Sequence, residues 1–233
     1  MINLNLDEYQ QEGLYLILPD SSRLMLTKEV IEETFGKWRK DSAKIPLRVQ
    51  EAAEFQRCQI CPLRSKGGVC DAIRPIFPFL EIVDKYVSFD KVTAIFKGES
   101  KGIVHVSDST MQEALKHVSI LSLIHYCQNG RKYRKYFFGI IPLMSPKEVA
   151  SRIYLNIYWL HKGRKEEIEK VVTRFSEEIR QTSRNQVKRL NMICKNDAFM
   201  NAFVATQVAT EFLSMDMNSV LEQSFASIES SPQ

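Results

Sequence analysis

The sequence lacks the long apolar runs and the short catalytic motifs by which many membrane proteins and enzymes are identified. Its apolar stretches at residues 118–127 and 153–160 are interrupted by polar residues and fall well short of the ~20 residues that a membrane-spanning helix needs. No Walker-type phosphate loop, His-Glu-x-x-His motif or Gly-x-Ser-x-Gly motif occurs. We therefore expect no membrane span, and the sequence favours a non-enzymatic role.

Signals for secretion are missing as well. Residues 1–10 are acidic and lack the basic, apolar and small-residue order of a signal peptide. The chain has 5 cysteines, and an odd number fits a secreted disulfide framework poorly. We expect a cytoplasmic protein, in which clustered cysteines more often bind metal or carry out redox chemistry.

The most informative motif is a group of three cysteines, Cys58, Cys61 and Cys70, in which the first two are separated by two residues. Such spacing can turn two sulfurs toward one point, and soft thiolates select zinc or iron–sulfur centres. A fourth ligand must come from elsewhere in the chain. Cys127 is the preferred donor, with His125 as its substitute. The expected cofactor is Zn²⁺ or a [4Fe–4S] cluster, which the sequence does not distinguish.

Two other interpretations of these cysteines stay open. Free cysteines are often simply buried small apolar residues, and a Cys-x-x-Cys pair can serve as a redox-active dithiol. The flanking residues favour the metal site because Arg57, Arg64 and Lys66 are too polar for a core segment. These cations, with Arg74, would also offset the negative charge of a tetrathiolate centre. Cys194 has no cysteine neighbour, and we expect it to lie in the core.

A basic segment at residues 131–136 raises the possibility of nucleic-acid binding. It combines two tyrosines with four cations, namely Arg131, Lys132, Arg134 and Lys135. Cations can bind phosphates and aromatic rings can stack on bases. The net charge of the chain is only +4, however, so a solvated turn is the favoured interpretation and nucleic acid is not the favoured partner.

The hydrophobic pattern predicts an α+β fold with a small antiparallel sheet, packed helices, a cysteine-rich metal-binding loop and a C-terminal helical hairpin. Apolar runs around turn-forming residues indicate strands at 14–18, 23–27, 91–97, 102–106 and 136–141. Helical spacing of apolar residues indicates helices at 28–40, 108–127, 145–163, 164–182 and 197–225. The Ser-Pro-Lys-Glu sequence that begins at Ser145 is a capping box with proline at the first helical position.

We divide the chain into an α+β four-cysteine domain at residues 1–162 and a helical hairpin extension at 163–233. The extension begins with a charged helix that carries a short apolar stripe of coiled-coil type. We therefore expect a protein partner, or self-association, to involve residues 164–225.

The cysteine motif also resembles a bacterial domain of unknown function. The resemblance rests on Cys58, Cys61-Pro62-Leu63, Cys70 and a helix that ends in Cys127. It covers about residues 12–162 and implies a strand pair before the cysteines, a serine-rich helix after them and Cys127 as the fourth ligand. Because that family has no settled activity, the resemblance implies a four-cysteine arrangement and a bacterial origin and little else. We expect a non-enzymatic, metal-stabilised bacterial regulatory or scaffold protein that binds a macromolecular partner. The sequence differs from the family pattern at His125 and Tyr126.

Overall fold

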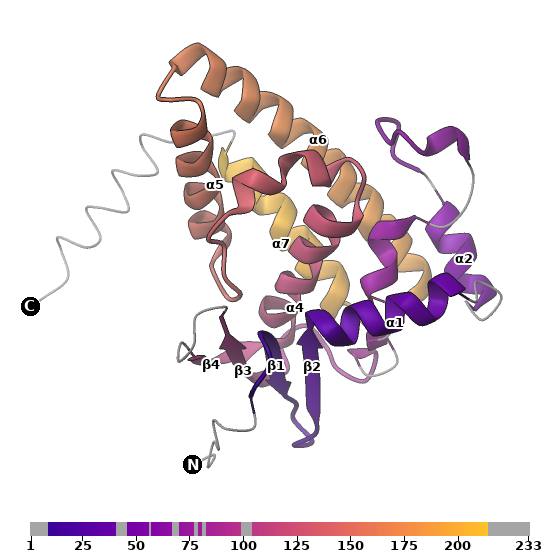
Figure 1. The fold of residues 1–233 in the computed structure, drawn as a ribbon. Helices are drawn as coiled ribbons and strands as arrows, with labels where there is room; N and C mark the ends of the chain where they lie inside the picture. Colours follow the sequence, from indigo (N-terminus) through magenta and orange to yellow (C-terminus); the bar gives the residue numbers. More distant parts are fainter. Residues whose placement is uncertain are drawn as a thin grey trace, which may run out of the picture.

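The fold is a four-stranded sheet covered on one face by a group of helices (Figure 1). The computed structural model describes residues 9–40, 46–55, 57–66, 70–76, 79–80, 83–98 and 104–213. In chain order the elements are β1 (Gly13–Ile17), β2 (Arg23–Thr27), α1 (Lys28–Lys40), α2 (Leu47–Glu54), η3 (Arg64–Lys66), η4 (Asp71–Ile76), β3 (Lys91–Lys97), β4 (Val104–Thr110), α4 (Met111–Leu121), η5 (Ser122–Tyr126), η6 (Gly130–Phe137), α5 (Pro146–Leu160), α6 (Lys165–Ile193) and α7 (Ala198–Leu213).

The sheet has the strand order β2-β1-β3-β4, and every neighbouring pair is antiparallel. Side chains alternate between its two faces because successive residues of a strand point to opposite sides. Leu14 and Leu16 of β1 point into the main core under the helices. Tyr15, between them, packs with Tyr9 and Ile95 in a small cluster of its own. The sequence prediction of an α+β fold with a small antiparallel sheet is therefore confirmed.

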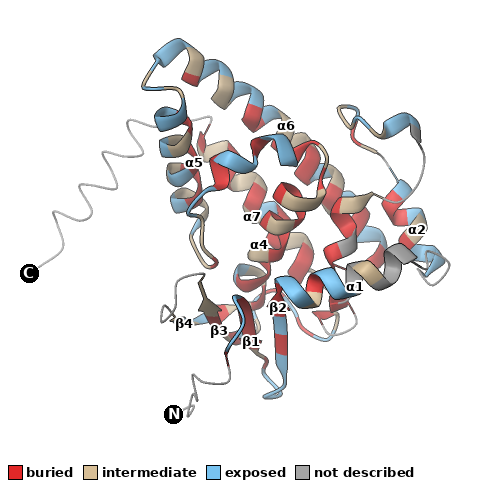
Figure 2. Cartoon of the chain, in the orientation of Figure 1, coloured by how far each residue is buried: buried red, intermediate tan, exposed pale blue. Residues whose placement is uncertain are grey.

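Helix α7 lies among the other long helices, α4, α5 and α6, and its apolar residues fill the space between them (Figure 2). Phe199 and Phe203 join the core under the sheet, whereas Ala209 and Leu213 join a second core. The predicted helical hairpin is present as α6, a short connection and α7. Residues 214–225 of the predicted second helix lie outside the described residues. The division into two domains at residue 162 stays a prediction.

The predicted strand at residues 136–141 is wrong. Tyr136 and Phe137 end the 3₁₀ helix η6, and the chain then turns at Gly139, whose φ is +74°. The Asn156 side chain donates hydrogen bonds to the carbonyl oxygens of Tyr136 and Phe138, at 2.9 and 2.8 Å. These carbonyls are thus satisfied by a side chain of α5, where a strand would have used a neighbouring strand.

Helix α5 begins at the predicted capping box. The Glu148 backbone N–H donates to Ser145 Oγ at 3.2 Å, and the Ser145 backbone N–H donates to Glu148 Oε2 at 2.6 Å. These two bonds satisfy backbone donors that the first helical turn leaves without partners. The helix then buries Val149, Ile153 and Ile157 against the second core.

Replacement of Ser145 by alanine should lower the free energy of unfolding by about 1 kcal/mol, because an N-cap side chain is lost. The control is Ser151→Ala in the same helix, which removes a hydroxyl without touching the cap. Urea denaturation of both variants would measure the difference. Equal unfolding midpoints for the two variants would show that the capping box does not stabilise α5.

Candidate metal centre

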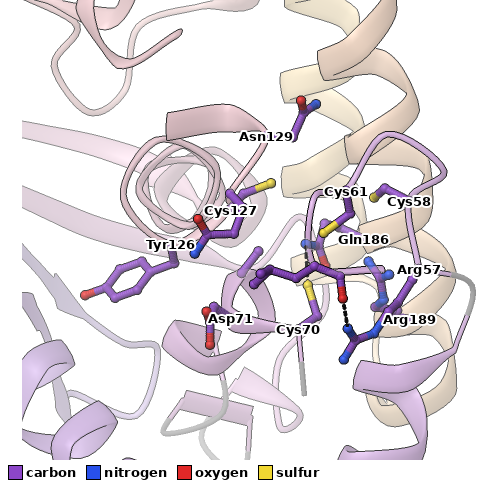
Figure 3. Close-up of a pocket in the computed structure, with 13 residues that line it drawn as sticks. Arg57, Cys58, Cys61, Cys70, Asp71, Tyr126, Cys127, Asn129, Gln186 and Arg189 are labelled. Atoms are coloured by element: carbon purple, nitrogen blue, oxygen red, sulfur yellow. Dashed lines mark hydrogen bonds between the residues drawn. The ribbon is translucent and has the colours of Figure 1, made fainter. Parts of the chain in front are cut away.

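The four predicted ligands line one cavity. Cys58, Cys61, Cys70 and Cys127, called here the cysteine quartet, all contribute to the wall of a cavity of about 50 Å³. Figure 3 shows Cys127 on one side of the cavity, Cys58 and Cys61 on the opposite side, and Cys70 below them. All of the cysteines in the structure carry free thiols. We call this space the cysteine cavity.

The loop after α2 positions the first two sulfurs. The Cys61 N–H donates to the Cys58 carbonyl oxygen at 2.9 Å, and the Arg64 N–H donates to the Cys61 carbonyl oxygen at 3.0 Å. These bonds form two successive turns, which keep both side chains of the Cys-x-x-Cys pair on the side of the cavity (Figure 3). Cys58 is buried, whereas Cys61 is partly exposed.

The other two cysteines are held at the ends of short helical turns. Cys70 stands directly before η4, and its carbonyl oxygen accepts a hydrogen bond from the Ile73 N–H at 3.2 Å. Cys127 ends the π-helical turn η5, where its N–H donates to the Ser122 carbonyl oxygen at 3.0 Å. Such π turns are uncommon and are often found at functional sites. Here the wider turn ends at a buried cysteine that faces the cavity.

Gly130 allows the chain to fold back beside Cys127. A Cβ atom at this position would overlap the carbonyl oxygen of Leu123 and would stand 2.8 Å from its carbonyl carbon. The Gly130 N–H also donates to Cys127 Sγ at 3.4 Å. The close approach therefore requires glycine, and it gives the Cys127 sulfur a hydrogen-bond donor.

Helix α6 forms another wall of the cavity through Gln186 and Arg189, which are 0% and 1% exposed. The Gln186 side chain donates from Nε2 to Cys70 Sγ at 3.8 Å, while its Oε1 accepts no hydrogen bond from any described residue. Arg189 donates from Nε to the Phe55 carbonyl oxygen at 3.0 Å. The sequence analysis missed both residues, because in the sequence they stand in a highly charged helix that resembles a solvated one.

The wall of the cavity carries a net positive charge while the thiols are neutral. Arg57 and Arg189 contribute two guanidinium groups, and Asp71 contributes one carboxylate. Arg57 is held in place by a hydrogen bond from Nη1 to the Leu63 carbonyl oxygen at 2.8 Å. Two guanidinium groups in so small a space favour an anionic occupant over a neutral one.

Burial keeps the Cys127 thiol neutral. It raises the pKa of Cys127 to about 12, against the opposing effect of the Gly130 N–H, and the nearby Cys70 and Cys58 raise it further. Near pH 7 this side chain is therefore a thiol. A metal ion that binds here must displace its proton, because the thiolate is the form that ligates metals.

The cysteine quartet lines the cavity without forming a recognised site for a single metal ion. Among the residues that the structure describes, no group of three or more His, Cys, Asp or Glu side chains is arranged to hold a single metal ion. The predicted metal-binding loop is therefore unconfirmed as a metal site. What the structure adds is that all four predicted ligands share one cavity.

The remaining candidate ligands lie elsewhere. His125 does not line the cavity, and burial lowers its pKa. Cys194 caps the C-terminus of α6 and packs against the main core, as the sequence analysis expects. Burial raises the pKa of Cys194 to about 12. Cys127, and not His125, is the residue of its segment that faces the other three cysteines.

The basic segment does not present its tyrosines to solvent. Tyr133 and Tyr136 are buried in η6 and pack edge-on against Phe175 of α6, with ring centroids 5.0 and 6.1 Å apart. Lys132 forms an ion pair with Glu178. Both rings are part of the second core, so the structure does not offer them for stacking on bases. The four cations of the segment are exposed.

The fold and the cavity together define an α+β domain with four thiols around a partly buried cavity. The chain belongs to a family described as a domain of unknown function, DUF6901, whose model matches residues 25–229. The matched region includes α6 and α7, so the similarity extends past residue 162 and over the helical hairpin.

No curated protein and no solved structure matches the chain. In the described part of the chain, no helix is long and apolar enough to cross a membrane.

Substitution of Gly130 by alanine should lower the free energy of unfolding by about 1–3 kcal/mol, because the new methyl group overlaps the Leu123 backbone. The control is Gly36→Ala in α1, where the added carbon meets no described atom within 4 Å. That change should stabilise the protein by about 0.5–1 kcal/mol through helix propensity. Denaturant titrations compare the two. A Gly130→Ala variant as stable as the wild type would contradict the tight turn after Cys127.

Proposed function

We propose that this protein is a non-enzymatic metal–thiolate protein in which the cysteine quartet holds a metal centre. The observation that carries the proposal is that four cysteines from three separate segments line one cavity. Cys127 is separated from Cys70 by β3, β4, α4 and η5. Free cysteines buried only for their apolar character have no reason to gather around a common space.

The chemistry of the wall supports the proposal. A centre ligated by four thiolates is anionic, and Arg57 and Arg189 would offset part of that charge. The hydrogen bonds from Gln186 and Gly130 to two of the sulfurs would stabilise the thiolate form. The same cavity offers little to a redox-active dithiol alone, because such an enzyme needs only two of the four cysteines.

The centre would add a covalent link between three segments of the chain that already pack against one another. It would tie the loop after α2, η4 and η5 to one another beside α6, and its binding energy would add to the folding energy.

We further propose that the metal-stabilised domain acts as a bacterial regulatory or scaffold protein with a macromolecular partner. Phe175 and Ile179 point into the second core, so a partner that binds α6 would contact its outward, charged side.

The proposal predicts that Cys127→Ser lowers the metal content of the purified protein more than tenfold. Loss of a group that merely hydrogen-bonds a ligand already costs about 10–100-fold in metal affinity, and loss of a ligand costs more. The matched control is Cys194→Ser, which removes a partly buried thiol that does not line the cavity and should leave the metal content unchanged. Elemental analysis of anaerobically purified protein measures both, and circular dichroism verifies that each variant is folded.

Two results would count against this function. Wild-type protein without stoichiometric metal would exclude a resident centre, and full metal in folded Cys127→Ser would exclude this ligand set. If the wild type is free of metal and Cys58 and Cys61 form a reversible disulfide, the dithiol alternative replaces the metal centre. Salt-dependent binding to nucleic acid that is lost on neutralising the four exposed cations of η6 would instead favour the nucleic-acid alternative.

A further inference from the structure

We propose that the cysteine cavity accommodates a cubane [4Fe–4S] cluster and not a single zinc ion. This inference rests on the proposed function, because it assigns the chemical class of the centre that the quartet would hold. Three features of the cavity carry it: its volume, the separate origins of the four ligands and the N–H donors that face two of the sulfurs.

The cysteine cavity is larger than one zinc ion needs. In a closed tetrahedral zinc site every sulfur stands ~2.3 Å from the ion, so the four sulfurs are in contact and leave no free volume. The cysteine cavity has a volume of about 50 Å³, several times the ~10–15 Å³ that one water molecule requires. Within the described ranges, the side chains also show no single-ion arrangement. A cubane places its own iron and sulfide atoms between the cysteines, so its ligands stand apart around a filled space.

The separate origins of the ligands fit a cluster for a related reason. Four sulfurs that share one zinc ion must converge, and structural zinc sites commonly achieve this with two closely spaced ligand pairs. Here only Cys58 and Cys61 form such a pair, while Cys70 stands singly before η4 and Cys127 singly after η5. In a cubane each iron takes one cysteine, so single cysteines on separate elements can each reach their own iron.

The electrostatics of the wall fit a redox-active cluster. Gln186 donates to Cys70 Sγ at 3.8 Å and Gly130 donates to Cys127 Sγ at 3.4 Å. Hydrogen bonds to the sulfurs and the degree of solvent exposure are two of the factors that set cluster reduction potentials. Cys58 and Cys127 are buried, whereas Cys61 and Cys70 are partly exposed. One side of the cluster would therefore lie near solvent, where electrons can enter and leave.

Anaerobic purification from cells supplied with both iron and zinc tests this assignment. The expected product is brown, with about four iron atoms and about four acid-labile sulfides per chain, and it absorbs visible light that dithionite bleaches by one-electron reduction. Colourless protein with about one zinc per chain and no sulfide would overturn the cluster and leave the metal–thiolate function standing. Folded protein with no metal would overturn both.

Gln186→Met provides a second test, because it retains the volume of the side chain but removes the donor to Cys70. A reduced cluster carries more negative charge, so loss of an N–H donor should lower the reduction potential while iron and sulfide contents stay unchanged. The matched control is Gln207→Met on α7, where the side chain bonds to Glu211 and does not line the cavity. A potential equal to that of the control would contradict a cluster bound against Gln186.

Discussion

The structure depends on how α6 packs, because this helix, like α7, contributes side chains to both hydrophobic cores. Near its start and middle, Phe175 and Ile179 pack into the second core beneath η6 and α5. Near its end, Leu190 and Ile193 pack into the main core beneath the sheet. The cysteine cavity lies where the two cores meet, and Cys70 packs against both of them. Any change that tilts or shifts α6 would therefore alter the two cores and the cavity together.

The inward face of α6 between the cores is polar, although it is buried. Thr182, Ser183 and Gln186 are 0% exposed and Arg189 is 1% exposed. Burial of polar groups costs free energy unless they are hydrogen-bonded, so an apolar sequence would serve stability better here. Departures from such local rules tend to occur at functional sites. The polar middle of α6 supports, independently of the cysteines, the interpretation that this junction serves a purpose other than packing.

Local signals in the sequence were sufficient for most of the fold. The capping box at Ser145 and the apolar runs on either side of the turn at residues 19–22 identify their elements without reference to the rest of the chain. The misassigned strand at 136–141 has apolar residues of strand type, but its carbonyls are bound by Asn156, a long-range contact that no local pattern encodes. The cysteines form a local spacing pattern, so they could be predicted as a group. Gln186 is brought to the cavity by the packing of α6, which is a long-range arrangement, so it could not be predicted.

The separation of the cavity walls along the chain has a consequence for biosynthesis. A ribosome delivers the Cys58–Cys61 pair and Cys70 well before Cys127, and Gln186 and Arg189 emerge later still. Because chains begin to fold from the N-terminus during translation, the nascent protein passes through a stage with three exposed thiols and no enclosing wall. The cavity is therefore enclosed only after α6 has been synthesised, and until then Cys58, Cys61 and Cys70 stand open to any thiol-binding metal ion.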